Sequence, residues 1–233
     1  MSTIEAALLV RSPAKGRVKR RLAAEIGTTH AAALYRRFVP DMLAAFEEAS
    51  VEPVICHHPP GDGDAVRRWL GPGRRLLGQR GRDHPMRLRH AFEDLFADGA
   101  ERVVAFASDV PDLPARLISR AGRALERTDA VLGPSADGGY YVIGFRRERF
   151  VPGAFRGIDW SGERTFDQTV EIVRGAGRRL GILPRWHDVD TADDLVALVR
   201  RNRATAFRGS LTMGYLRHHP EVLGSRTGDA WDD

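Results

Sequence analysis

Cysteine is almost absent from this sequence, which has one such residue, Cys56, among 233. A single cysteine excludes an internal disulfide and any cluster of cysteines around a metal. Cys56 ends the apolar run 54–56, so we expect a small core residue of a strand rather than a nucleophile. Long apolar runs are also missing, because the stretch 6–10 is too short for a signal peptide or a membrane span. These absences predict a cytoplasmic protein.

Lysine is the second scarce residue. The chain has 36 lysines and arginines together, but only Lys15 and Lys19 are lysines, and both lie in the segment 11–22. A lysine ammonium is a compact, movable point charge, whereas arginine is chosen elsewhere in the chain. The segment follows an apolar strand and leads into a helix, which is where α/β folds bind phosphate. It therefore predicts an anion site; a solvated basic helix start is the alternative interpretation.

Charge of neither sign is concentrated over a long stretch. The formal net charge is +5, but the 31 acidic residues are spread through the chain and no long basic tract occurs. We interpret the excess as arginine usage plus an anion site, and expect neither nucleic acid nor a membrane as a partner. A hydrophobic content of 42% is that of an ordinary globular protein with a sizeable core.

Apolar strands and amphipathic helices alternate along the chain. Expected strands are 4–10, 53–56, 75–77, 102–107, 130–132, 140–145 and 180–183. Expected helices are 18–26, 30–49, 65–70, 86–96, 114–127, 165–174 and 191–200, with Pro40 kinking the second or splitting it in two. The alternation predicts an α/β fold, a sandwich with a mostly parallel sheet, over residues 1–201. Residues 202–233 lose this periodicity and are expected to form a C-terminal appendage, partly helical or frayed.

Asp109 comes directly after the clearest central strand. Open α/β sheets bind ligands at the carboxyl ends of their strands, and Pro111 stops the strand from continuing. A carboxylate there can hold Mg²⁺ or Mn²⁺, which prefer hard oxygen ligands. The alternative is that Asp109 or Asp112 caps the following helix; we assign the cap to Asp112 and the metal to Asp109.

Asp188 and Asp190 follow the last expected strand and are two residues apart. In extended backbone they face the same side, where their charges repel unless a cation or a proton lies between them. A divalent metal satisfies that requirement. Asp193 and Asp194 fit the first turn of the last helix and need no other role.

The run Asp137-Gly138-Gly139-Tyr140 is a third candidate. Two glycines permit a tight turn and close approach of the backbone to a ligand, with Asp137 as a ligand contact or a base. A purely structural turn accounts for the glycines equally well. The histidines at 57, 58, 84, 90 and 187 show no paired spacing typical of zinc ligands.

In this order the motifs resemble a known family, the bacterial GT-A-type, glycosyltransferase-like proteins often encoded near radical-SAM or arsenosugar genes. That family is related to the molybdenum-cofactor and 2-phospho-L-lactate guanylyltransferases. The matching residues are Pro13, Gly16, Lys19, Arg21, Leu22, Gln79, Gly81, Asp83, Arg87, Ser108-Asp109-Val110-Pro111, Gly133-Pro134, Asp137-Gly138-Gly139-Tyr140-Tyr141, Gly144, Trp160-Ser161 and Asp188-Val189-Asp190-Thr191. The match covers residues 4–200.

The resemblance implies a GT-A α/β/α sandwich, a nucleotide-activated donor and a divalent metal, Mg²⁺ or Mn²⁺. By similarity, Asp109, Asp188 and Asp190 hold the metal, and Lys19 with Arg21 holds the donor phosphates. Two positions depart from the family pattern. Arg20 stands where threonine is usual, and His84-Pro85 stands where Leu-Gly is usual, in the loop expected to meet the nucleobase or the acceptor.

These observations lead to a metal-dependent transferase as the main hypothesis, nominally a glycosyltransferase acting from an NDP-sugar on a small-molecule acceptor. The catalytic residues expected are Asp137, Asp109 and Lys19. Expected nucleotide and phosphate contacts are Arg11, Lys15, Gly16, Lys19, Arg21, Gln79, Gly81 and Arg87. The acceptor is expected near Gly138, Gly139, Tyr140, Trp160 and Ser161.

Two alternatives stay open at this point. The first is nucleotidyl transfer from an NTP to a phosphorylated small acid, which needs a second anion site that the arginines at 80, 82, 87 and 89 can supply. The second is a non-catalytic nucleotide-binding module, because a fold does not fix a function. A homodimer is compatible with either.

Overall fold

One mixed sheet organises the protein. The computed structural model describes residues 4–14, 16–160 and 163–227. Within them seven strands form the sheet: β1 Ile4–Arg11, β2 Val54–His58, β3 Leu76–Gly78, β4 Arg102–Phe106, β5 Ala130–Pro134, β6 Tyr140–Arg146 and β7 Leu180–Ile182. Their order is β3-β2-β1-β4-β6-β5-β7, and only β6 runs antiparallel to its neighbours. The expected α/β architecture with a mostly parallel sheet is therefore confirmed.

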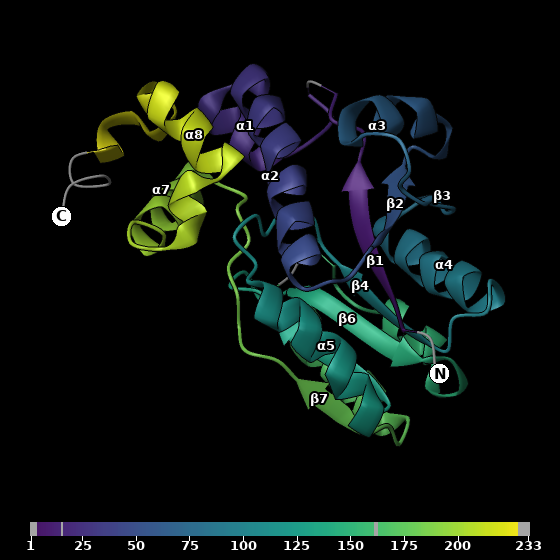
Figure 1. The fold of residues 1–233 in the computed structure, drawn as a ribbon. Coiled ribbons are helices and arrows are strands. Elements are labelled where there is room, and N and C mark those ends of the chain that lie inside the picture. Colours follow the sequence, from purple (N-terminus) through teal and green to yellow (C-terminus); the bar gives the residue numbers. More distant parts are fainter. Residues whose placement is uncertain (1–3, 15, 161–162, 228–233) are drawn as a thin grey trace.

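Helices cover both faces of the sheet (Figure 1). The described helices are α1 Arg20–Ile26, α2 Thr28–Glu48, α3 Gly63–Leu70, α4 His84–Ala97, α5 Ala115–Arg127, α6 Thr165–Gly175, α7 Ala192–Arg201 and α8 Leu211–His218. The first face carries α2, α5, α7 and α8, and the second carries α4 and α6. In β1 the side chains of Ala6, Leu8 and Val10 join the first core and Ala7 joins the second, because successive residues of a strand face opposite sides.

Pro40 does not split the second helix. The expected split is therefore wrong, since α2 runs as one helix from Thr28 to Glu48 with Pro40 inside it, and a kink at Pro40 stays a prediction. A proline lacks the N–H that bonds the carbonyl four residues earlier, here that of Arg36. The indole Nε1 of Trp69 in α3 donates to the Arg36 oxygen at 3.1 Å and so replaces the missing donor.

The segment after α7 packs onto the first face. Met213 and Leu216 of α8 are fully buried against the core, and α8 lies beside α2 (Figure 1). The carboxylate of Asp41 in α2 accepts the N–H groups of Leu211 and Thr212 at 2.9 and 2.8 Å, so it caps the start of α8. Division of the chain near residue 201 stays a prediction. No helix in the described part of the chain combines the length and apolar character that crossing a membrane requires.

Candidate functional site

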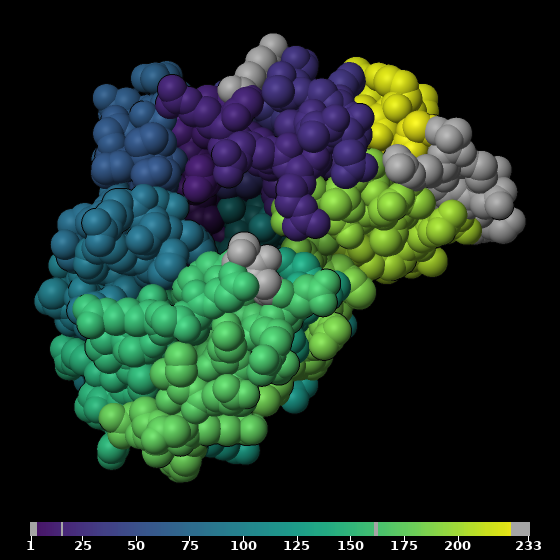
Figure 2. Space-filling model, turned by 180° about the vertical axis from the view of Figure 1, so that it is seen from behind, coloured from purple at the N-terminus to yellow at the C-terminus, as the bar shows by residue number. Residues whose placement is uncertain are grey.

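Loops from four strands meet at one edge of the sheet. Lys19 follows β1, Asp109 follows β4, Asp137 follows β5, and Asp188 and Asp190 follow β7. This edge opens into a cleft with a cavity of about 370 Å³, within the range typical of small-molecule sites. Figure 2 shows the molecule hollowed there, between the N-terminal segment in purple and the green segment around residues 130–160.

Lys19 lies at the centre of the cleft, and its side chain is only 6% exposed. Its Nζ donates to Asp190 Oδ1 at 2.6 Å and to Asp109 Oδ2 at 3.1 Å. Burial opposes the charged form, but the two carboxylates outweigh it and raise the pKa of Lys19, so the ammonium is charged. The backbone of Lys19 is left-handed, with φ 46° and ψ 54°, which costs a non-glycine residue about 1–3 kcal/mol and is typical of functional sites.

Asp188 and Asp190 flank the fully buried Val189, and Asp190 lines the cavity. Oxygen atoms of Asp137, Asp188 and Asp190 lie within 4.8 Å of one another. Burial, then the negative charges of Asp109 and Asp137, raise the pKa of Asp188 to about 7. Burial would also raise the pKa of Asp190, but Lys19 and Arg21 outweigh it and lower that pKa.

This donor set fits a divalent cation with a preference for oxygen, such as Mg²⁺ or Mn²⁺. Burial is the largest cause of the raised pKa of Asp188, and the neighbouring carboxylates add to it; such a cation would neutralise their negative charge. The group differs in one residue from the expected set of Asp109, Asp188 and Asp190. Asp137 is within ligand distance of Asp188 and Asp190, whereas Asp109 is not part of that group; Lys19 pairs with both Asp109 and Asp190.

Arg20 and Arg21 begin α1 at the rim of the cleft. Both line the cavity and are exposed, and Arg21 Nη1 lies 3.4 Å from Asp190 Oδ2. Arg11 and Arg17 line the cavity as well, whereas Gly16 is not among the lining residues. Lys15 lies outside the described residues.

A second group of positively charged side chains lines the same cavity as Lys19, Arg20 and Arg21. Arg87 is 6% exposed and lines the cavity with Arg11 and His58. Burial and the positive charge of Arg11 lower the pKa of Arg87, and His58 Nδ1 is buried without a hydrogen-bond partner among the described residues. Like charges and an unpaired polar atom gathered in a cavity indicate a binding place for an anion.

Three more arginines, at positions 80, 82 and 89, were expected with Arg87 to supply a second anion site, but they do not line the cavity. Arg80 pairs with Asp94 and Arg89 with Glu93, and Arg82 is exposed on the surface. Of these four arginines, therefore, Arg87 is the one that lines the cavity.

Gln79 and Gly81 shape the loop between β3 and α4. The buried side chain of Gln79 donates to the carbonyl of Cys56 and also lines the cavity. Gly81 has φ 126°. A Cβ at this position would come within 2.9 Å of the backbone nitrogen of Arg87 and of the Met86 Cβ. Gly81 thus allows the loop to lie against the start of α4, which orients Arg87.

Gly138 is explained by packing within the protein. It has φ 89°, and a Cβ would lie 2.0 Å from the carbonyl oxygen of Glu163. The Asp137 carboxylate accepts from Ser135 Oγ at 2.5 Å and from the Gly139 N–H at 2.9 Å, which closes the turn. The structural alternative for the two glycines therefore has direct support.

Aromatic rings form one wall of the cavity, at residues where the sequence places the acceptor only as an expectation. Trp160 contacts His84 and Tyr140 edge-on, with centroids 5.4 and 6.0 Å away, and the latter two line the cavity. His84 lies in the first turn of α4 at the position where the family pattern has leucine. Ser161 lies outside the described residues.

Asp112 is not a helix cap, which corrects the sequence assignment. Pro114 is the N-cap residue of α5, and no side chain caps it. The buried Asp112 carboxylate instead accepts from Arg201 Nε at 2.6 Å and Nη2 at 3.0 Å, from Asn202 Nδ2 at 2.7 Å and from Trp186 Nε1 at 3.2 Å. By contrast, the expected position of Asp193 and Asp194 in the first turn of the last helix is confirmed, and Thr191 caps α7 in a capping box with Asp194.

Tyr35 is a cleft residue that the sequence did not reveal. Its hydroxyl accepts from the Arg11 N–H at 2.9 Å and bonds Ser108 Oγ at 2.8 Å, so it joins the loops after β1 and β4. It lies among the apolar residues of α2, and helical periodicity by itself marks it as core. His58 was equally hidden, as the last residue of a strand.

The family follows from comparison with known proteins. The chain belongs to the family described as an uncharacterized protein conserved in bacteria (DUF2064), whose model matches residues 42–162. A solved structure from Desulfovibrio desulfuricans G20, provisionally assigned as a nucleotide-diphospho-sugar transferase, is 40% identical. It aligns with a TM-score of 0.90 over 96% of this chain and 97% of that one. No curated protein matches the sequence.

More distant structures share the fold alone. CMP:2-keto-3-deoxy-manno-octonic acid synthetase, solved with CTP, is 12% identical with a TM-score of 0.55, over 84% of this chain and 97% of that chain. The Rv0371c protein of Mycobacterium tuberculosis H37Rv, solved with manganese, is 21% identical with a TM-score of 0.51, over 84% and 97%.

Proposed function

We propose that this protein is a metal-dependent transferase that uses a nucleotide-activated donor, and that it transfers a glycosyl group from an NDP-sugar to a small-molecule acceptor. The observation that carries the proposal is the convergence of Lys19 with Asp109, Asp137, Asp188 and Asp190 at the rim of a 370 Å³ cavity. Support for the donor class comes from the Desulfovibrio structure, which is similar over nearly the whole chain.

The cations at the start of α1 are proposed to bind the diphosphate of the donor. Lys19 is held by two carboxylates, and Arg20 and Arg21 stand beside it at the rim with exposed side chains. The departure from threonine to Arg20 therefore adds a donor for phosphate oxygens on the same side of the cavity.

Asp137, Asp188 and Asp190 are the proposed holders of Mg²⁺ or Mn²⁺. When bound there, a divalent cation neutralises the negative charge that develops on the departing diphosphate. Asp109 is proposed to act on Lys19 instead, since its carboxylate and that of Asp190 hold the ammonium in the cleft against the left-handed backbone strain of Lys19. The role of Asp137 as acceptor of the incoming hydroxyl's proton is the alternative to its metal binding, because Oδ1 accepts two hydrogen bonds within the turn and Oδ2 is left for one of the two roles.

The first experiment is a thermal shift of the full chain against nucleoside di- and triphosphates and NDP-sugars, with and without Mn²⁺. A ligand of the native state raises the melting temperature by mass action. We expect at least one nucleotide to do so, more strongly with Mn²⁺. If none does in either condition, donor binding is wrong. Binding without turnover of any donor would favour the non-catalytic module.

Nucleotidyl transfer is a second candidate, and one observation favours it. Arg11, Arg87 and the unpartnered His58 Nδ1 form a second anion-binding group in the same cavity, which a phosphorylated acid or the tail of an NTP requires. The products separate the two reactions: NDP release from a sugar nucleotide supports glycosyl transfer, and pyrophosphate release from an NTP supports nucleotidyl transfer.

A further inference from the structure

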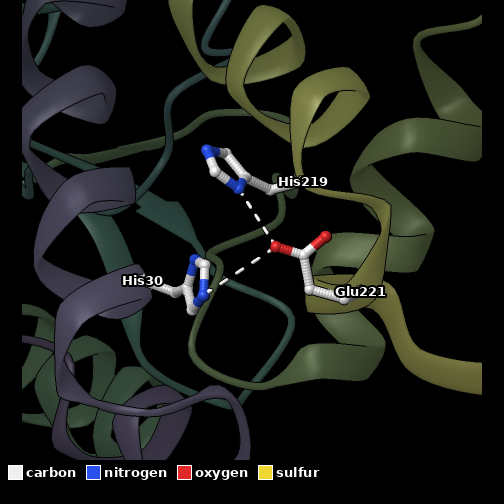
Figure 3. A group of neighbouring side chains, drawn as sticks. All are labelled: His30, His219 and Glu221. Atoms are coloured by element: carbon white, nitrogen blue, oxygen red, sulfur yellow. Dashed lines mark hydrogen bonds and ion pairs between the residues drawn. The ribbon is translucent and has the colours of Figure 1, made fainter.

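A second group of metal-ligating side chains lies outside the cleft, where the start of α2 meets the segment that follows α8. His30 belongs to α2, His219 follows α8 directly, and Glu221 lies in the next turn. Figure 3 shows the three side chains pointing toward one another from these two segments. One ligand atom of each lies within 4.8 Å of the other two.

The distances suit coordination of a small cation. His219 Nδ1 lies 3.0 Å and His30 Nε2 lies 4.0 Å from the same oxygen, Oε1 of Glu221. The longer distance exceeds that of a hydrogen bond. Two ligands at the usual zinc bond lengths of about 2.0–2.1 Å in tetrahedral geometry are roughly 3.3 Å apart. The two observed distances lie on either side of this value, and shifts of a few tenths of an ångström in half-exposed side chains reach it.

The surroundings orient the two imidazoles. Tyr215 Oη lies 2.8 Å from His30 Nδ1, and the Tyr215 ring lies against that of His219 with centroids 4.3 Å apart. When Nδ1 of His30 donates to the phenol oxygen, the lone pair of Nε2 is left facing Glu221. Metal-binding histidines ordinarily have such a partner on the other ring nitrogen. Arg37 covers the Tyr215 ring at 4.2 Å and fixes it in place.

We propose that His30, His219 and Glu221 bind a transition-metal ion of the Zn²⁺ type, with water completing the coordination. Two imidazole nitrogens and one carboxylate are ligands suited to zinc, whereas the oxygen-only group in the cleft suits Mg²⁺ or Mn²⁺. The ion would join the start of α2 to the segment after α8 and so clip the C-terminal part of the chain to the first face of the sheet. This proposal is independent of the function proposed for the cleft.

The test is a titration of the full chain, freed of metal with a chelator, with Co²⁺ as a spectroscopic probe and then Zn²⁺. Imidazole-bound Co²⁺ of low coordination number has strong visible absorption, which six-coordinate Co²⁺ with oxygen ligands lacks. We expect such bands in the wild-type protein and in Asp188→Asn, which alters the cleft, and we expect Zn²⁺ to remove them by displacement.

The variants address the two histidine ligands and the tyrosine that orients one of them. His30→Ala and His219→Ala should lose the Co²⁺ bands and the rise in melting temperature caused by Zn²⁺, while His218→Ala, an exposed neighbour, should keep both. Tyr215→Phe leaves all three ligands and should weaken Zn²⁺ binding by about 10- to 100-fold, as expected for the loss of an orienting partner. Absence of the bands in the wild type, or equal Zn²⁺ affinity of His30→Ala and wild type, would overturn the proposal.

Discussion

Asp109 and Asp112 are three residues apart in one loop, yet they belong to groups of opposite character. Asp112 is paired with a single cation, Arg201, and two further donors complete its hydrogen bonds. Asp109 lies near three more aspartates, and among the described residues Lys19 and Arg21 form the ion pairs with this group, Arg21 from an exposed position.

The difference lies in charge balance. A buried carboxylate with a matched cation and a full set of donors is stable as it stands, so the Asp112 group holds α7 and the loop after β4 together. In the cleft, burial and then the neighbouring negative charges raise the pKa of Asp188, and such a group gains from a further cation. Both networks are buried, and the candidate site differs from the structural network beside it in its excess of negative charge.

The largest expected effect is on stability. Asp112→Asn removes the buried counter-charge of the Arg201 guanidinium, whose side chain is 21% exposed, and breaking such a largely buried pair costs about 3 kcal/mol. Denaturant unfolding measures the loss. Mn²⁺ affinity of the remaining folded protein should be unchanged; a parallel loss of Mn²⁺ affinity would mean that the two groups are not separate.

Asp190→Asn is the matched change in the cleft. It removes a charge from the proposed metal group and one partner of Lys19, so turnover of the donor found in the nucleotide panel should fall about 10²- to 10³-fold. Circular dichroism and the melting temperature should stay near those of the wild type. Full activity would remove Asp190 from the site.

Lys19→Met separates the two roles of the central cation. The ammonium of Lys19 competes with a metal ion for the carboxylates of Asp109 and Asp190. Without it, the Mn²⁺ affinity measured by calorimetry should rise about tenfold. Nucleotide binding should weaken in the same variant, because a phosphate ligand is lost. Arg89→Met, at a surface pair with Glu93, is the control that should change neither. A fall in Mn²⁺ affinity would contradict the proposed competition.

Unlike Asp112→Asn and Asp190→Asn, the variant Asp188→Asn should be more stable than the wild type. Its free energy of unfolding should be higher by about 1 kcal/mol at pH 8 with a chelator present. The folded pKa of about 7 lies above the usual value of 3.8, so the wild type loses stability as pH rises from about 4 to 7 and its carboxylate ionises. Asparagine carries no such charge, and the advantage of the variant should therefore shrink as pH falls toward 4. Melting curves across this range provide the measurement, and a variant less stable than wild type at pH 8 would contradict the charge argument.

Much of the fold is readable from the sequence. The alternation of apolar strands and amphipathic helices predicts the strands β1 to β7 and the helices α1 to α7 in order, because periodicity is a local property. Pro40 was the exception. Its effect depended on Trp69, a residue in another helix that bonds the carbonyl Pro40 leaves free.

The candidate site was readable in part. Lys19, Asp109, Asp188 and Asp190 each follow a strand, and the carboxyl ends of parallel strands meet at one edge, so their convergence was predictable. The pairing of Lys19 with Asp109 and Asp190 was not, and neither was the cationic group of Arg11 and Arg87. Whether a given charge faces a partner or a cavity depends on contacts between distant segments.

By itself the sequence determined the α/β fold and the edge where its aspartates gather, since both depend on local pattern and chain order. The tertiary structure decided which charges are balanced: Asp112 meets Arg201, while Asp188 is left among like charges. It also brought His30 to His219 and Glu221 from opposite ends of the chain, a juxtaposition that no spacing of histidines encodes. Side chains far apart in sequence become neighbours only when packing of the core fixes their positions.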